Sequence, residues 1–229
     1  TVIFLLAFFV IFFWGAFEQA GASLTLFADR QTERTIFGWE MPASYFQSVN
    51  PLAVISLAPI MTIVWGFLYA RKLEPSSPKK MAIGLGLVAL GYVVIAIAVK
   101  GLGLGEKVSM WWLIGLYVIH TIGELCLSPI GLSMVSKLAP LRLSSLMMGT
   151  WFLANAAANK FAGTLSALIP GGEDGTGGAT SFLGFQITNL YEFFILFIIM
   201  SGAAAAILFV LSSWLEKRMH NDHVEGQTE

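Results

Sequence analysis

Apolar residues in this chain form six long runs, where a soluble helical protein would show polar stripes. The runs cover residues 2–28, 46–70, 80–99, 109–132, 146–169 and 190–214 and end at charged residues, proline or glycine. A bilayer core about 30 Å thick needs roughly 20 mostly apolar residues per helix. The pattern predicts an all-α integral membrane protein of six transmembrane helices, with no strands and no repeat of 20–50 residues.

Basic residues in the loops predict the orientation. Eight of them fall on one side of the membrane and four on the other, and the richer side is expected to be cytoplasmic together with both termini. The eight are Arg71, Lys72, Lys79, Lys80, Lys137, Arg142, Lys217 and Arg218. The four are Arg30, Arg34, Lys100 and Lys107.

The segments between the runs also carry signals. Loop 29–45 holds Trp39, Pro42 and Tyr45, which predicts an interfacial hairpin. Loop 170–189 is rich in glycine and is expected to be mobile. Residues 216–229 are expected to form a polar cytoplasmic tail.

Composition narrows the class of protein. Of 229 residues, 56% are hydrophobic and 12% charged, and the net charge is -1. These values exclude a disordered chain and a nucleic-acid-binding surface. The single Cys126 forms no internal disulfide, and no Cys/His cluster has the spacing of a metal site.

Charged residues inside a span cost roughly 2.5–3.5 kcal/mol on insertion scales, so they usually face a cavity, a partner or a proton path. Glu18 lies deep in the first run. It is expected to be a protonatable carboxylate in a transport path, or otherwise a neutral, hydrogen-bonded structural group. In a continuous helix one face would carry Glu18, Ala22, Thr25 and Asp29. Asp29, near the outer surface, would pair with Arg30 or Arg34 or gate the outer mouth.

The second and third runs differ in polarity. In the second, Gln47 and Asn50 share a face, either to bind a ligand or to bond across helices. Asn50 precedes a proline, and Pro59 lies deeper in the same run, so this helix is expected to bend. The third run has no charge inside it and is expected at the periphery, with its glycines permitting close packing.

The fourth and fifth runs carry further polar stripes. The fourth has Tyr117, His120, Glu124 and Ser128 on one face, followed by Pro129, which is expected to break or bend the helix. This stripe is expected to line water or a ligand, although His120 could simply be the hydrogen-bond partner of Glu124. The fifth has Trp151, Asn155 and Asn159 on one face, as a pocket wall or as core, and an unusual Lys160.

The deep acids, Glu18 and Glu124, each fall in the first helix of a triplet of runs. That arrangement is expected of a 3+3 inverted repeat with its site near the midplane.

Several motifs resemble one transporter family. They are Phe17–Ser23, Phe27–Arg30, Phe46–Pro51, Gly123–Ser133, Lys137–Pro140 and Met147–Leu153. They are similar to the bacterial branch of the proton-dependent oligopeptide transporters of the major facilitator superfamily. The resemblance implies that residues 1–215 are the C-terminal six-helix bundle, family helices seven to twelve, and that an N-terminal bundle is missing. The chain is then a fragment that is not expected to transport alone.

The resemblance also implies residue roles. Glu124 would bind the peptide amino terminus, Asn50 the peptide backbone, and Trp151 with Phe152 would line the pocket. Asn155 stands where some relatives have serine. Glu18 would couple protons, and Asp29 would gate the periplasmic mouth. Gln47 and Tyr117, on the faces of Asn50 and Glu124, complete the expected substrate-binding set.

The implied activity is proton-coupled symport of di- and tripeptides by alternating access in the bacterial inner membrane. It needs no cofactor, metal or catalytic residue, and its expected partners are peptides, protons, lipid and the missing bundle, without nucleic acid. One alternative is a carrier of another small zwitterionic or anionic solute. Another is a membrane structural subunit that does not transport, and a membrane enzyme is the least expected.

Overall fold

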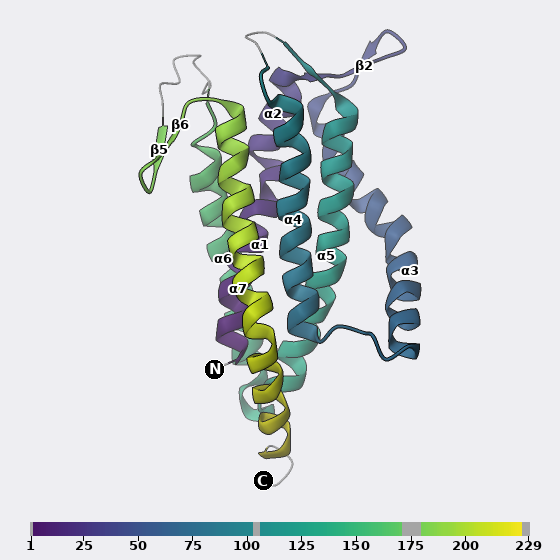
Figure 1. Ribbon diagram of the computed structural model, residues 1–229, viewed down its shortest axis with the longest axis vertical. Helices are drawn as coiled ribbons and strands as arrows, with labels where there is room; N and C mark the ends of the chain where they lie inside the picture. Colours follow the sequence, from purple (N-terminus) through teal and green to yellow (C-terminus); the bar gives the residue numbers. More distant parts are fainter. Residues whose placement is uncertain (1, 103–105, 171–179, 226–229) are drawn as a thin grey trace.

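A computed structural model describes residues 2–102, 106–170 and 180–225. Long helices run side by side in one elongated bundle, and pairs of short strands lie toward one end of it (Figure 1). Five helical stretches of the described chain are long and apolar enough to cross a membrane: Val2–Gln31, Ala43–Ala70, Ser77–Val99, Met110–Leu138 and Leu190–Met219. The predicted spans are confirmed at these five places.

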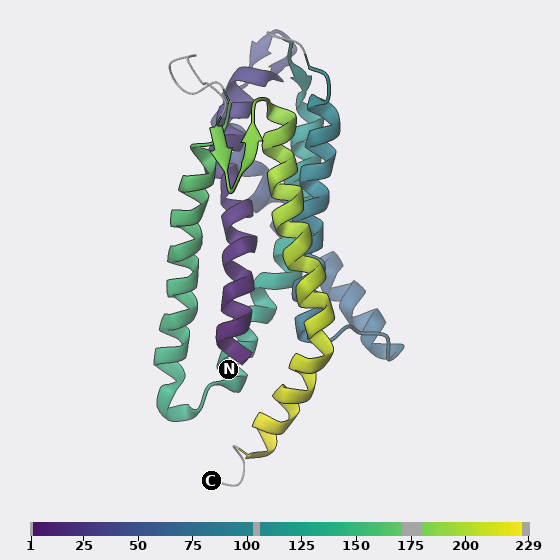
Figure 2. The ribbon, with the colours of Figure 1, turned by 60° about the vertical axis from the view of Figure 1, so that its left-hand side comes forward.

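The remaining predicted span is helix α6, Ser144–Ser166. It is long enough to cross a membrane and stands alongside α1 in the bundle (Figure 2). Its asparagines and Lys160 make it more polar than the other five, and it is not among the candidate spans. A short 3-10 turn, Leu141–Leu143, leads into it.

The first span is not the continuous helix that the sequence predicts. Helix α1, Val2–Phe17, passes into a 3-10 turn, η1, at Glu18–Gly21, and helix α2 begins again at Ser23 and ends at Gln31. Ala22 between them has φ -126° and ψ -103°, outside the helical region. The expected single face from Glu18 to Asp29 is therefore wrong, because the helix is interrupted where that face begins.

Helix α3, Val49–Ala70, follows a 3-10 turn, η2, at Ala43–Ser48. It packs mainly against α5, leans away from the bundle toward its far end, and has no buried residue (Figure 1). The predicted Pro59 lies inside this helix.

Helix α4, Ser77–Val99, lies between α5, Met110–Leu138, and α7, Leu190–Glu225 (Figure 1). The expectation that this span is peripheral is wrong for the described chain, since α4 has a long buried face that includes Tyr92. The expected close packing of its glycines is confirmed at Gly84. A Cβ atom there would lie 2.7 Å from the carbonyl oxygen of Gly123 on α5.

Two helices extend beyond their predicted ends. Helix α5 continues through Pro129 to Leu138, and α7 continues to Glu225. Much of the predicted polar tail 216–229 is therefore helical, and 226–229 lie outside the described residues. The start of α1 and the end of α7 lie at the same end of the bundle (Figure 1), as an even number of spans requires.

Short strands are present, contrary to the sequence prediction. Strand β1, Thr32–Glu33, pairs in parallel with β4, Val108–Ser109. Two hairpins join β2, Thr35–Ile36, to β3, Trp39–Glu40, and β5, Thr180–Phe182, to β6, Phe185–Ile187. Strands of two or three residues are too short to leave a recognisable alternation.

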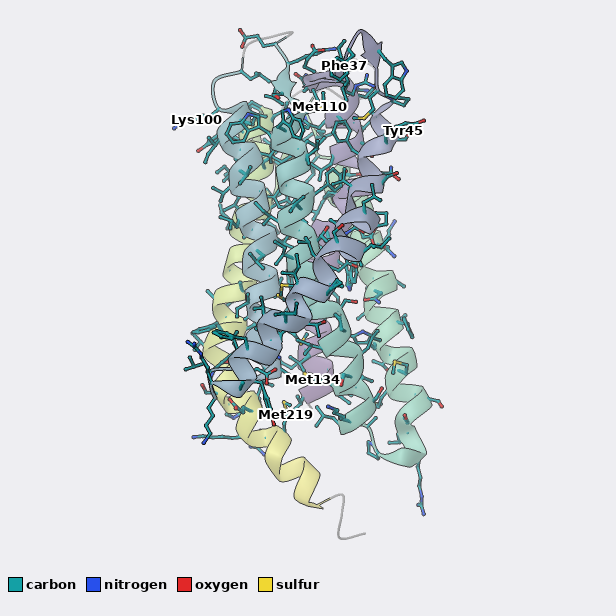
Figure 3. All side chains as sticks on the ribbon, turned by 90° about the vertical axis from the view of Figure 1, so that its right-hand side faces the viewer. Phe37, Tyr45, Lys100, Met110, Met134 and Met219 are labelled. Carbon is teal, nitrogen blue, oxygen red and sulfur yellow. The ribbon has the colours of Figure 1, made fainter. Side chains whose placement is uncertain are left out.

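The β2–β3 pair confirms the hairpin predicted within loop 29–45. Phe37 at its turn and Lys100 lie at one end of the bundle, and Met134 and Met219 lie toward the other (Figure 3). Of the loop 170–189, which is expected to be mobile, residues 171–179 lie outside the described residues, and residues 180–187 form the β5–β6 hairpin.

Candidate functional site

The interruption of the first span is stabilised by hydroxyl groups from neighbouring helices, which donate hydrogen bonds to its backbone carbonyls. Tyr92 on α4 donates a hydrogen bond to the carbonyl of Ala16 at 2.7 Å. Tyr117 on α5 donates to the carbonyl of Ala20 at 3.2 Å. Irregular backbone at membrane depth is tolerated only where other groups satisfy its polar atoms or where it lines a cavity. Both conditions hold here.

A buried glutamine fastens the same break to α6. The Gln19 amide donates to the carbonyl of Gly15 at 3.1 Å and to the carbonyl of Ala162 at 3.0 Å. Ser23, at the start of α2, donates to the Gln19 side-chain oxygen at 2.6 Å. Gln19 therefore connects the two halves of the broken helix to a neighbouring helix.

A cavity of about 320 Å³ opens beside this break. Its volume lies at the lower end of the range of small-molecule sites. It is lined by residues of α1, η1, η2, α3 and α5: Trp14, Phe17, Glu18, Ala20, Gly21, Gln47, Asn50, Tyr117 and Glu124. The lining described here carries two acids and no Lys, Arg or His.

Glu124 and Asn50 form the polar centre of the cavity. The Asn50 amide donates to Oε2 of Glu124 at 2.8 Å and to the Thr121 hydroxyl at 3.0 Å. The Thr121 hydroxyl in turn donates to the carbonyl of Tyr117 at 2.8 Å. This chain of bonds fixes the orientation of the carboxylate, and charge-assisted bonds of this kind are stronger than neutral ones.

Glu18 contributes the second carboxyl to the same cavity. It begins the 3-10 turn η1 and lines the same cavity as Glu124. Two carboxyls in one desolvated site repel each other when both are ionised. The arrangement therefore favours a bound cation, an ammonium group or a proton.

Five residues of the predicted site converge here, from runs far apart in the sequence: Glu18, Gln47, Asn50, Tyr117 and Glu124. Gln47 also bonds to the break through a relay, because its amide donates to the Thr25 hydroxyl at 3.2 Å and that hydroxyl donates to the Ala20 carbonyl at 2.8 Å.

Three predicted residues on α6 do not line this cavity. Trp151 is buried against α5, where a Cβ on Gly131 would collide with its indole ring. Phe152 is 54% exposed, and Asn155 is half-buried with an Oδ1 atom that has no hydrogen-bond partner in the described structure. The face of α6 that carries Trp151 is its packing face, which places Trp151 in the core. A role for these residues in binding stays a prediction.

Two other predicted residues take local partners. Nε2 of His120 lies 3.1 Å from the carbonyl of Val88, so His120 bonds to the α4 backbone and is a buried packing residue. Asp29 pairs with Arg34 at 3.0 Å, which confirms one of its two expected partners. Arg34 also bonds to Glu40 at 2.9 Å and so joins α2 to the β2–β3 hairpin. Gating by Asp29 stays a prediction.

Sequence reasoning missed the aromatic wall of the cavity. Trp14 and Phe17 line it, and Trp14 precedes Glu18 by one helical turn. The sequence did carry a signal for Trp14. Trp151 was selected because it is a tryptophan deep within a span, and Trp14 meets the same criterion. Thr121 was missed because a single threonine in a membrane helix usually bonds to its own backbone.

A sequence model of the POT family matches residues 1–177. The chain belongs to the POT family. This family comprises membrane transporters that use the proton gradient without a cofactor, and it is not a family of enzymes.

Two bacterial proteins are among the relatives of this POT chain. It is 42% identical over 170 residues to the peptide transporter YePEPT of Yersinia enterocolitica. The aligned region covers 73% of this chain and 33% of that protein. It is 31% identical over 228 residues to dipeptide and tripeptide permease A of Erwinia pyrifoliae. This aligned region covers 98% of this chain and 44% of that protein. The chain thus spans less than half the length of these relatives.

The fold of the POT chain also matches solved structures. A crystal structure of a POT family transporter in complex with a thioalcohol-conjugated peptide superimposes with a TM-score of 0.76 at 31% identity. The match covers 93% of this chain and 41% of that one. The chain is therefore a multi-pass membrane protein with the fold of part of a POT transporter.

Proposed function

We propose that the chain supplies one half of the binding site of a proton-coupled symporter of di- and tripeptides. The observation that supports this most directly is the convergence of Glu18 and Glu124 on one cavity with amide and hydroxyl groups. The names of the two relatives, a peptide transporter and a dipeptide and tripeptide permease, point to the same substrates. The other half is the expected N-terminal six-helix bundle, and the membrane is the bacterial inner membrane with both termini cytoplasmic.

In this proposal Glu124 binds the peptide ammonium group. Asn50 holds Oε2 of this carboxylate in place, which leaves the acid oriented before the peptide arrives. Gln47 and Tyr117 face the peptide main chain from the same cavity. Because these contacts use the amino terminus and backbone that all peptides share, and the wall is apolar, side chains are discriminated weakly.

Glu18 is the proton-coupling group. When both acids are ionised they repel each other, and either a proton on Glu18 or an ammonium group on Glu124 relieves that repulsion. Glu18 also lies at the break between α1 and α2, where a change of charge acts on a backbone held by hydrogen bonds. Proton and peptide together therefore shift the balance between the outward-open and inward-open states.

The remaining expectations fit the same proposal. Six spans in a 3+3 inverted repeat would place the two acids at equivalent positions of the repeats. Trp151, Phe152 and Asn155 would approach the peptide from α6 in another state of the cycle, and Asp29 would close the outer mouth.

The test uses the full-length protein in liposomes with an inward proton gradient and labelled dialanine. Wild type should accumulate dialanine, whereas Glu124→Gln and Glu18→Gln should not. Glu192→Gln is the matched control, because Glu192 is an α7 acid that bonds to Thr188 outside the cavity. It should accumulate dialanine as wild type does.

The results separate the two roles and the alternatives. If Glu18→Gln retains peptide exchange but loses accumulation, Glu18 couples the proton and does not bind the peptide. A folded wild type that takes up no dialanine would refute the peptide assignment. Full activity after loss of both acids would indicate that the cavity has no part in transport. Two acids already argue against a simple anion as substrate.

A further inference from the structure

The β5–β6 hairpin, Thr180–Ile187, carries an apolar residue where a turn normally carries a polar one. Leu183 and Gly184 connect the two strands with φ angles of 49° and 84°. A two-residue turn with two positive φ angles strongly favours Asn, Asp or Gly. Leu183 occupies this unfavourable conformation and is 94% exposed. Neither the backbone nor contact with water explains a leucine here.

The rest of the hairpin has no ionisable side chain. Its strands carry Phe182 and Phe185, which pack partly against the apolar core, and Ile187, which is buried. The exposed side chains of the strands, Ser181 and Gln186, are polar but uncharged. An apolar tip with uncharged polar flanks is suited to the boundary between lipid headgroups and acyl chains.

The hairpin also lies at the depth of that boundary. Figures 1 and 2 show that its strands run back along α6 and α7, with the turn directed toward the middle of the bundle. A three-residue strand is about 10 Å long, and α7 starts its apolar span at Leu190, just after β6. The turn is therefore level with the first turns of a membrane-spanning helix. Water is excluded from the lipid-facing side of such a helix.

We propose that the β5–β6 hairpin inserts its turn into the lipid leaflet beside α6 and α7 and anchors this end of the bundle. The Leu183 side chain is surrounded by the glycerol and upper acyl region of phospholipids. The deeper hydrocarbon does not suit it, because the free edges of a two-stranded hairpin need polar partners. The β2–β3 hairpin has the same turn at Phe37 and Gly38, but the ion pair of Arg34 and Glu40 holds it at the end of the bundle. This inference requires only that the chain crosses a membrane, so it stands apart from the transported substrate.

The experiment places an environment-sensitive fluorophore at Leu183→Cys in the full-length protein, in phosphatidylcholine–phosphatidylglycerol vesicles. Glu33→Cys, at the exposed end of strand β1, is the aqueous reference, and Ile199→Cys, on the exposed side of α7, is the deep reference. The unsubstituted protein, in which Cys126 is buried, gives the labelling background. Quenching is measured with aqueous iodide and with lipids that carry a doxyl group near the headgroup or near the chain end.

The fluorophore at Leu183 should be shielded from iodide several-fold more than the one at Glu33. The shallow doxyl lipid should quench it more than the deep one does, with the reverse order at Ile199. Iodide quenching equal to that at Glu33 would place the turn in water and overturn the proposal. Shielding from iodide and from both doxyl lipids would also overturn it, because the turn would then be covered by protein, from the other half of the transporter or a second copy.

Discussion

The contact between α4 and α5 at Gly84 offers a prediction whose size follows from the structure. In Gly84→Ala the new Cβ would lie 2.7 Å from the carbonyl oxygen of Gly123 and 3.1 Å from Cβ of Leu127. The first of these atoms is backbone and cannot rotate away, so the two helices must move apart. Gly86→Ala is the matched control on the same helix, because its Cβ would meet only Cβ of Ala205 at 3.9 Å, an ordinary contact.

The comparison isolates the steric cost. Both substitutions replace glycine inside a helix and share a gain of roughly 0.5–1 kcal/mol in backbone entropy. Only Gly84→Ala adds overpacking, which costs about 1–3 kcal/mol. The difference in free energy of unfolding between the two variants should therefore be about 1–3 kcal/mol, with Gly84→Ala the less stable.

Thermal unfolding of the full-length protein in detergent, followed by tryptophan fluorescence at one fixed scan rate, measures this difference. At about 2–4 °C per kcal/mol for a domain of 150–250 residues, the midpoint of Gly84→Ala should lie at least about 2 °C below that of Gly86→Ala. Gly123→Ala should reproduce the loss, since its Cβ would lie 2.8 Å from the Gly84 carbonyl oxygen. Equal midpoints, or a lower one for Gly86→Ala, would refute the close packing on which the reasoning rests.

Three further predictions concern the site and its surroundings. Asn50→Ala removes the donor to Glu124, and a bond to a charged group contributes about 1.5–3 kcal/mol. Its dipeptide Kd, measured by calorimetry, should rise about tenfold or more, against less than about threefold for Asn189→Ala, whose side chain bonds to Thr188 outside the cavity. Equal effects of the two substitutions would contradict the role of Asn50. Tyr117→Phe removes one of the two hydroxyl donors to the Ala20 carbonyl, the other being Thr25, and should lower the free energy of unfolding by about 0.5–1.5 kcal/mol, whereas Tyr45→Phe, with an exposed side chain, should change little. Hydrogen bonds from Thr35 hold the pKa of Glu33 below its ordinary value. The order of strand β1 around Glu33 should therefore be constant near neutral pH and should be lost as the pH falls through that lowered pKa. Hydrogen exchange should show this loss in wild type, and a Glu33→Gln variant with the same pH dependence would contradict it.

The sequence alone determined the class of protein and the polar centre of the site. Whether a segment of about 20 residues partitions into lipid depends mainly on its own composition, so five runs could be located without a partner. The cost of a charge in lipid is also local, which is why Glu18 and Glu124 were recognisable as functional candidates. Asn50 and Gln47 followed from helical spacing near the start of α3.

Tertiary structure decided which of these candidates meet and how the first span is shaped. The break after Phe17 depends on hydroxyl groups of Tyr92 and Tyr117, which are far away in the sequence, and no local pattern reports such partners. Trp151 is buried because Gly131 on α5 lies opposite it and leaves room for the indole ring. The spacing of residues along α6 alone cannot predict which residue of α5 lies opposite. Composition therefore places a helix in the membrane, and packing between helices decides which of its faces lines a cavity.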